Sequence, residues 1–146
     1  MLKRTHLALG VAVALYFLPH VNNKLIFLAT VIISTMLPNL EQVLSRGKVE
    51  GALKQVFMHR GILHTYTLCI AASIFLAFFY PMFALPFFLG YSFHLTLDAF
   101  TTDGIRPFWP LKRRSTGKIR TGSKVDSTIF YILILFDLAL FIKLFI

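Results

Sequence analysis

The chain has 146 residues, of which 57% are hydrophobic and 14% are charged, and its mean hydropathy is +0.73. Soluble domains usually carry about a quarter charged residues, so this balance excludes an ordinary soluble protein. The formal net charge of +9 comes from basic residues that flank apolar stretches. We therefore expect them to face anionic lipid head groups, and we expect no nucleic-acid binding.

The first two apolar stretches cover about residues 5–21 and 25–40. A bilayer core about 30 Å thick requires roughly 20 apolar residues in a helix, so both stretches are short. The basic start and apolar middle of residues 1–19 are also typical of a signal peptide. No small-residue cleavage site follows, so we expect a retained helix.

The second half of the chain supplies up to three further helices. Residues 62–97 contain no Asp, Glu, Lys or Arg and are long enough for two crossings. Pro81 and Pro86 predict a tight hairpin between the two. A last apolar stretch covers about residues 127–145. The sequence thus predicts one membrane-embedded domain over residues 1–146, an all-α bundle of about four to five helices.

The Lys and Arg residues predict the orientation of this bundle. With alternating crossings, the N-terminus and the polar loops 41–60 and 101–126 share one side. That side holds every Lys and Arg except Lys24 and Lys143. The positive-inside rule places it in the cytoplasm, which predicts an integral protein of the cytoplasmic membrane.

Six ionisable side chains of metal-ligand type fall on the same cytoplasmic side. Such groups at membrane depth are costly and are usually functional. Although His6 alone could be an ordinary interface residue, the convergence of the set predicts a shared site at the cytoplasmic end. The set is His6, Glu41, His59, His64, His94 and Asp98.

The spacing within this set suits a divalent metal. His94 and Asp98 are four residues apart and share one helix face, although a structural ion pair would also explain them. His59 and His64 would diverge if both were helical, so we expect a helix to begin near Gly61, with His64 in its first turn. A ligand set of imidazole and carboxylate suits zinc best, and it does not exclude iron or manganese. A metal held in this way activates water for hydrolysis.

Three other aspartates allow more than one interpretation. Asp137 lies in the middle of the last apolar stretch, where helix packing and proton transfer both remain open. Asp103 and Asp126 border the second loop and could each add a carboxylate, although Asp103 with Gly104 is typical of a turn.

Four motifs in order resemble those of the YdjM family, described as LexA-regulated, membrane-bound, predicted metal-dependent hydrolases. They are "THLALG" (5–10), "LPNLEQ" (37–42), "HRGILHT" (59–65) and "GYSFHLTLDAFTTDG" (90–104), followed by "RPFWPL" (106–111). The resemblance covers nearly the whole chain. It implies a helical membrane domain distantly similar to zinc-dependent phospholipase C and related single-strand nucleases, which cleave phosphoesters with clustered zinc ions.

By this resemblance, His6, His59, His64, His94 and Asp98 match the family's ligand positions. The chain departs from the family where Leu-Pro-Asp-x-Asp is expected, because it has Asn39 and Glu41 there. Glu41 can still bind a metal, whereas the amide of Asn39 brings no charge. This departure puts a full multi-metal cluster in doubt.

Together these observations predict a metal-dependent hydrolase at the cytoplasmic membrane face. The expected cofactor is a divalent metal, with zinc first, and the expected substrate is a phosphoester in a lipid or lipid-linked molecule. We assign catalytic roles to Asp98 and Glu41, and phosphate binding to Arg60. The alternative is a catalytically degenerate membrane protein that binds a partner or anionic lipid through its basic loops. The oligomeric state stays open.

Overall fold

The computed structural model describes residues 1–40, 61–111 and 113–146, and this part of the chain is all-α. The expected all-α class and helix number are confirmed for these residues. The five α-helices are α1 (Lys3–Phe17), α2 (Lys24–Met36), α5 (Tyr66–Phe79), α6 (Pro81–Ala99) and α7 (Lys124–Phe145).

Helix ends follow the local sequence. The Thr65 hydroxyl accepts a hydrogen bond from the Leu68 backbone N–H at 3.2 Å and caps α5, and the Ser123 hydroxyl caps α7 by accepting from the Asp126 N–H at 3.3 Å. Before α5, the turn Ile62–His64 is a 3-10 helix. His64 therefore precedes α5 instead of lying in its first turn, which corrects the expected helix start near Gly61.

The break between α5 and α6 differs from the predicted hairpin at Pro81 and Pro86. Tyr80 alone separates the two helices, Pro81 is the first residue of α6, and Pro86 lies inside α6. A proline at the first helical position loses no hydrogen bond. Pro86 lacks a donor inside the helix, yet α6 continues through it, and its carbonyl accepts a hydrogen bond from the Ser34 hydroxyl at 3.4 Å.

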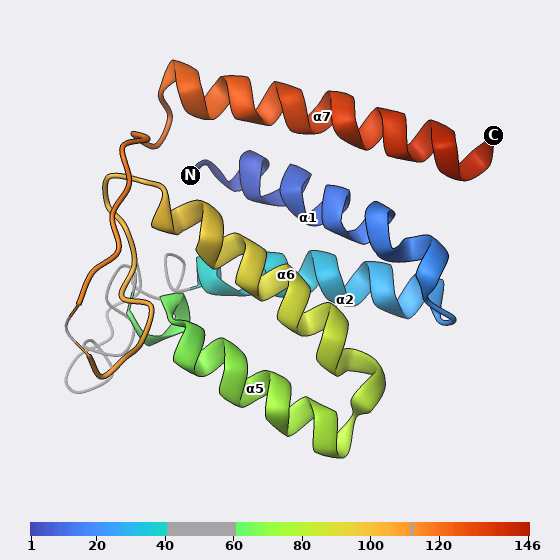
Figure 1. The fold of residues 1–146 in the computed structure, drawn as a ribbon, viewed down its shortest axis with the longest axis horizontal. Helices are drawn as coiled ribbons and strands as arrows, with labels where there is room; N and C mark the ends of the chain where they lie inside the picture. The colour runs from blue at the N-terminus through green and yellow to red at the C-terminus, as the bar shows by residue number, and fades with distance from the viewer. Residues whose placement is uncertain (41–60, 112) are drawn as a thin grey trace.

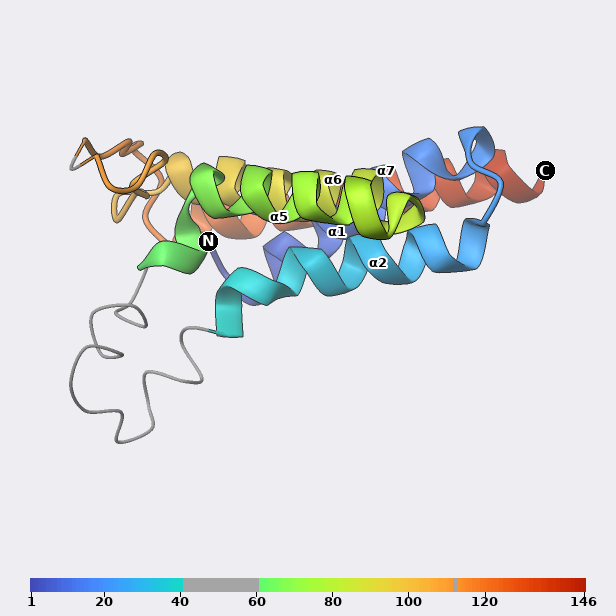
Figure 2. The same cartoon turned by 90° about the horizontal axis from the view of Figure 1, so that it is seen from below.

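The helices lie side by side in an elongated bundle. Figure 1 shows α7 and α1 at one edge and α5 at the opposite edge, with α6 and α2 between them. Figure 2, seen from below, shows α2 on one face of the molecule. The N-terminus, the ends of α2 and α6, and the starts of α5 and α7 all lie at one end of the bundle (Figure 1). This shared end is the one where the sequence placed the polar loops.

Two small cores hold the helices together. One joins α1 and α2 through Val13, Ala14, Phe27 and Val31. The other joins α5, α6 and the following loop through Cys69, Tyr91, Leu95 and Ile105, so that Cys69 has the packing surroundings of a core residue.

A glycine permits a close crossing of α2 and α6. A Cβ atom added at Gly90 of α6 would collide with the carbonyl oxygen of Val31 and the hydroxyl of Ser34, both on α2. Small residues allow backbones to approach closely in this way in membrane bundles. The crossing holds the middle of α6 close to α2.

Only one helix in the described part of the chain is both long and apolar enough to cross a membrane. It covers Lys124–Leu144 in α7, which packs chiefly against α1. Its large apolar side chains are exposed, among them Tyr131, Leu135 and Leu138. This arrangement suits a lipid environment, since lipid takes the place of a protein core around such side chains. Full crossing by the shorter helices stays a prediction.

Candidate metal site

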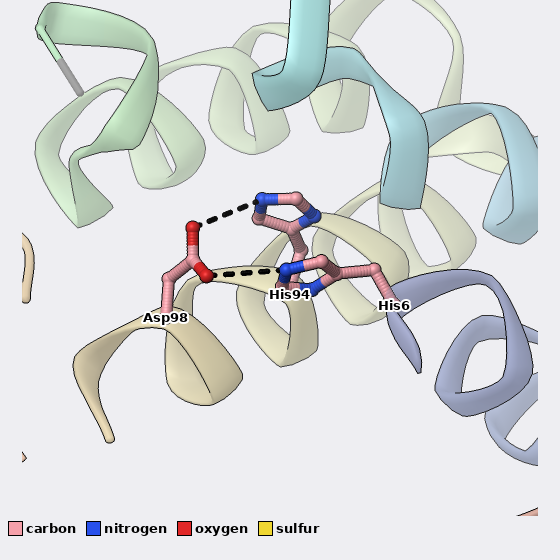
Figure 3. A group of neighbouring side chains, drawn as sticks. All are labelled: His6, His94 and Asp98. Carbon is pink, nitrogen blue, oxygen red and sulfur yellow. Dashed lines mark ion pairs between the residues drawn. The ribbon is translucent and has the colours of Figure 1, made fainter. Parts of the chain in front are cut away.

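Three ligand-type side chains converge at the end of the bundle that carries the loop between α6 and α7. His6 comes from the start of α1, whereas His94 and Asp98 come from the last two turns of α6. Figure 3 shows the carboxylate of Asp98 between the two imidazoles, with one oxygen toward each ring. His6 Nε2 lies 3.1 Å from Asp98 Oδ1, and His94 Nε2 lies 3.6 Å from Asp98 Oδ2.

The group is compact enough to hold one metal ion. One ligand atom from each of the three side chains lies within 4.8 Å of the others. The two imidazole rings stack with their centroids 3.9 Å apart. All three residues are buried, with exposed fractions of 1%, 0% and 3% for His6, His94 and Asp98.

Nitrogen atoms of this group lack hydrogen-bond partners in the part of the chain that the structure describes. They are Nδ1 of His6 and both ring nitrogens of His94. A buried polar atom without a partner costs roughly 1 to 3 kcal/mol, and native proteins contain few of them. A metal ion would take up such a lone pair, so the donor set fits a cation better than it fits a hydrogen-bonded core.

Two further groups lie beside the cluster. His64, also buried, places Nε2 3.5 Å from Asp98 Oδ2, and its ring packs edge-on against that of His94. The terminal ammonium group of Met1 lies 2.6 Å from Asp98 Oδ1. Asp98 therefore has positively charged or imidazole groups around both of its oxygens.

Neighbouring residues fix the segments that carry these ligands. The Tyr91 hydroxyl on α6 donates a hydrogen bond to the Leu63 carbonyl at 2.5 Å, which ties the turn before α5 to α6. The Thr101 hydroxyl donates to the Asp98 carbonyl at 2.7 Å and closes the end of α6. The ligands are thus held from helices and from a turn that is bonded to a helix.

The structure brings together four of the six predicted ligands: His6, His64, His94 and Asp98. Glu41 and His59 lie outside the described residues, as does Arg60 with its predicted phosphate-binding role. Their assignments stay predictions. Asn39, the departure from the family pattern, is buried in the turn Leu37–Asn39, and this turn contacts both α6 and the turn that carries His64.

The other carboxylates of the described residues, Asp103, Asp126 and Asp137, do not belong to the metal-binding group. Asp126 accepts hydrogen bonds from the Thr5 hydroxyl and the backbone N–H groups of Leu2 and Gly122. Asp103 lies in the turn before Gly104, whose positive φ of 59° suits a glycine, as the sequence indicated. Asp137 lines an apolar groove of about 570 Å³ between α1 and α7.

Sequence reasoning missed the residues that support the site. Thr5 and Tyr91 were not singled out, because a hydroxyl next to apolar residues looks the same whether or not it has a distant partner. The position of Thr5 directly before His6 is the signal that could have identified it. Adjacent residues of a helix point in different directions, so a hydroxyl next to a ligand can contact a second neighbouring element.

Comparison with family models supplies an independent result. The model of the family described as "YdjM inner membrane protein" matches residues 1–144. Comparisons with curated proteins and with solved structures give no significant match. The match spans both the ligand-bearing helices and the candidate membrane span, and the chain therefore belongs to the YdjM inner membrane protein family.

Proposed function

We propose that this protein is a membrane-embedded, metal-dependent hydrolase whose site lies at the cytoplasmic end of the bundle. The observation that carries the proposal is the buried group of His6, His94 and Asp98, in which both ring nitrogens of His94 have no hydrogen-bond partner among the described residues. Membership of an inner membrane protein family supports the membrane location of the protein.

His6, His94 and Asp98 are the residues that would hold the ion, and His64 is close enough to join them. Zinc fits two imidazoles and a carboxylate best, with iron or manganese as rivals. A bound divalent cation would supply Lewis acidity and lower the cost of ionising water. Because these side chains are buried, bulk water does not compete for the ion, and the electrostatic attraction between ion and ligands is stronger than in water.

A phosphoester in a lipid or lipid-linked molecule is the proposed substrate. The membrane location supports a lipid, and cation-assisted neutralisation of charge suits phosphoryl chemistry. Arg60, directly after His59 in the sequence, is the proposed contact for the phosphate, and Glu41 is a proposed ligand or base. No nucleic acid is expected as a partner.

Metal content tests the site directly. We expect detergent-purified protein to contain at least one equivalent of zinc, iron or manganese per chain by mass spectrometry. The double variant His94→Ala, Asp98→Ala should lose this metal. The control variant His20→Ala, Asp103→Ala, which alters the same residue types elsewhere, should retain it. Wild-type protein that stays metal-free after incubation with zinc would refute the metal site.

Activity is tested next, on a panel of phospholipids in mixed micelles with zinc. We expect phosphate-ester cleavage that disappears in Asp98→Ala. Turnover that is absent, or that persists in Asp98→Ala, would contradict the hydrolase assignment.

The second candidate is a non-catalytic membrane protein that binds a partner or an anionic lipid. Asn39 favours it, because an amide stands in the turn next to His64 where the family pattern has a carboxylate. In this case turnover would be absent, and the buried group would hold a structural metal or serve only as a polar cluster.

A further inference from the structure

A second buried carboxylate joins three segments of the chain close to the candidate metal site. Asp126, in the first turn of α7, is fully buried. Its Oδ1 accepts a hydrogen bond from the Thr5 hydroxyl at 2.8 Å. Its Oδ2 accepts from the backbone N–H of Leu2 at 3.0 Å and of Gly122 at 2.8 Å. One side chain thus binds the start of α1, the loop before α7 and α7 itself.

The electrostatic surroundings favour an ionised carboxylate at this place. The helices α1 and α7 run in the same direction and begin at the same end of the bundle (Figure 1). The unpaired N–H groups at a helix start carry partial positive charge. Asp126 therefore lies where the positive ends of two helices meet, and the Leu2 N–H that it binds belongs to the chain entering α1.

Thr5 and His6 are adjacent in α1 and contact two different helices. The Thr5 hydroxyl points to Asp126 on α7, while the His6 imidazole lies 3.1 Å from Asp98 on α6. Since both residues belong to the first turns of α1, the rotation of that helix about its axis sets both contacts at once. A change at the first contact should therefore alter the second.

We propose that Thr5 and Asp126 are positioning residues, whose hydrogen bond fixes the start of α1 so that the His6 imidazole faces Asp98. This assigns a role to the threonine that precedes the histidine and to a carboxylate that is no part of the metal-binding group. The consequence for metal affinity rests on the proposed function, whereas the consequence for the His6 ring does not.

Threonine substitutions isolate this hydrogen bond. Thr5→Val keeps the shape and removes the hydroxyl, whereas Thr5→Ser keeps the hydroxyl. Thr128→Val is the matched control, because Thr128 is exposed on the same end of α7. Among the described residues, its hydroxyl bonds only to the Lys124 carbonyl of its own helix. Asp126→Ala, which removes both acceptor oxygens, is the second variant if Thr5→Val does not fold.

The first measurement is the imidazole ¹⁵N chemical shift of His6 in metal-free protein. Labelling with ¹⁵N-histidine gives only five residues to resolve, and His6→Gln assigns the signal. We expect Thr5→Val and Asp126→Ala to move the His6 signals, and Thr5→Ser and Thr128→Val to leave them in place. Unchanged His6 signals in folded Thr5→Val or Asp126→Ala would overturn the proposal.

The second measurement is metal affinity, followed by the visible spectrum of bound cobalt(II). Loss of a residue that orients a metal ligand costs about 10- to 100-fold in affinity, and we expect a loss of this size in Thr5→Val, with restoration in Thr5→Ser. If wild type binds no metal while the His6 signals move, the proposed function fails and the positioning role stands. If wild type binds metal and Thr5→Val binds it equally with an unchanged spectrum, the positioning role fails and the metal site stands.

Discussion

At the scale of single residues, the informative feature is a set of buried polar atoms that have no hydrogen-bond partners among the described residues. His94 is fully buried, and neither of its ring nitrogens is hydrogen-bonded within the described part of the chain. A histidine kept only for packing would be replaced at lower cost by an apolar residue, because burial without hydrogen bonds is unfavourable. The pairing of His94 with Asp98 could be read from the sequence, whereas the stacking of His6 on His94 could not.

Asn39 is the residue whose chemistry decides between the two candidate functions. We expect Asn39→Asp to raise zinc affinity by about tenfold and to give or increase hydrolysis, because it returns a carboxylate to a turn that contacts the turn of His64. Zinc titration and the phospholipid assay measure both effects. Asn39→Ala is the control and should show neither. Metal affinity and turnover that are unchanged in Asn39→Asp would favour the non-catalytic protein.

At the scale of elements, apolar runs and capping residues determine where the helices lie in the sequence. Small residues determine how closely the helices pack. Ser123 and Thr65 mark the starts of α7 and α5, as hydroxyl residues before apolar runs usually do. Pro86 was wrongly expected to end a helix. The rule that proline breaks helices does not foresee a helix that continues through it with the Pro86 carbonyl bonded to Ser34 on a neighbouring helix.

The α2–α6 crossing gives a test of element packing. We expect Gly90→Ala to lower the free energy of unfolding by about 1 to 3 kcal/mol, since the added methyl group would meet the Val31 carbonyl and the Ser34 hydroxyl. Thermal unfolding in detergent measures the loss. Leu85→Ala, on the exposed side of α6, is the control and should stay close to wild type. Equal stability of Gly90→Ala and wild type would contradict this close crossing.

At the scale of the whole molecule, one end of the bundle differs from the rest. The basic loop between α6 and α7, the candidate metal site and the Asp126 hydrogen bonds share that end. Farther along α7, the helix surface exposes large apolar side chains. This asymmetry supports the proposed orientation, with the site at the cytoplasmic face and the apolar surfaces in lipid.

Cysteine labelling tests this orientation. In a Cys69→Ala background, which removes the single native cysteine, a cysteine is introduced by Ser115→Cys or by Asn22→Cys. We expect a membrane-impermeant maleimide added outside intact cells to label the Asn22→Cys protein and to spare Ser115→Cys until the membrane is opened. The reverse pattern would place the metal site on the outer face.

The sequence by itself determined the membrane class, the five helical segments and the residues of metal-ligand type. Composition, apolar runs and charge distribution are properties of the chain that need no tertiary contacts to be read. The tertiary structure alone decided that His6 stacks on His94, that His64 lies beside Asp98, and that Thr5 and Asp126 join α1 to α7. These contacts depend on how far each helix is rotated and shifted along its neighbours, and close packing between whole helices sets that register.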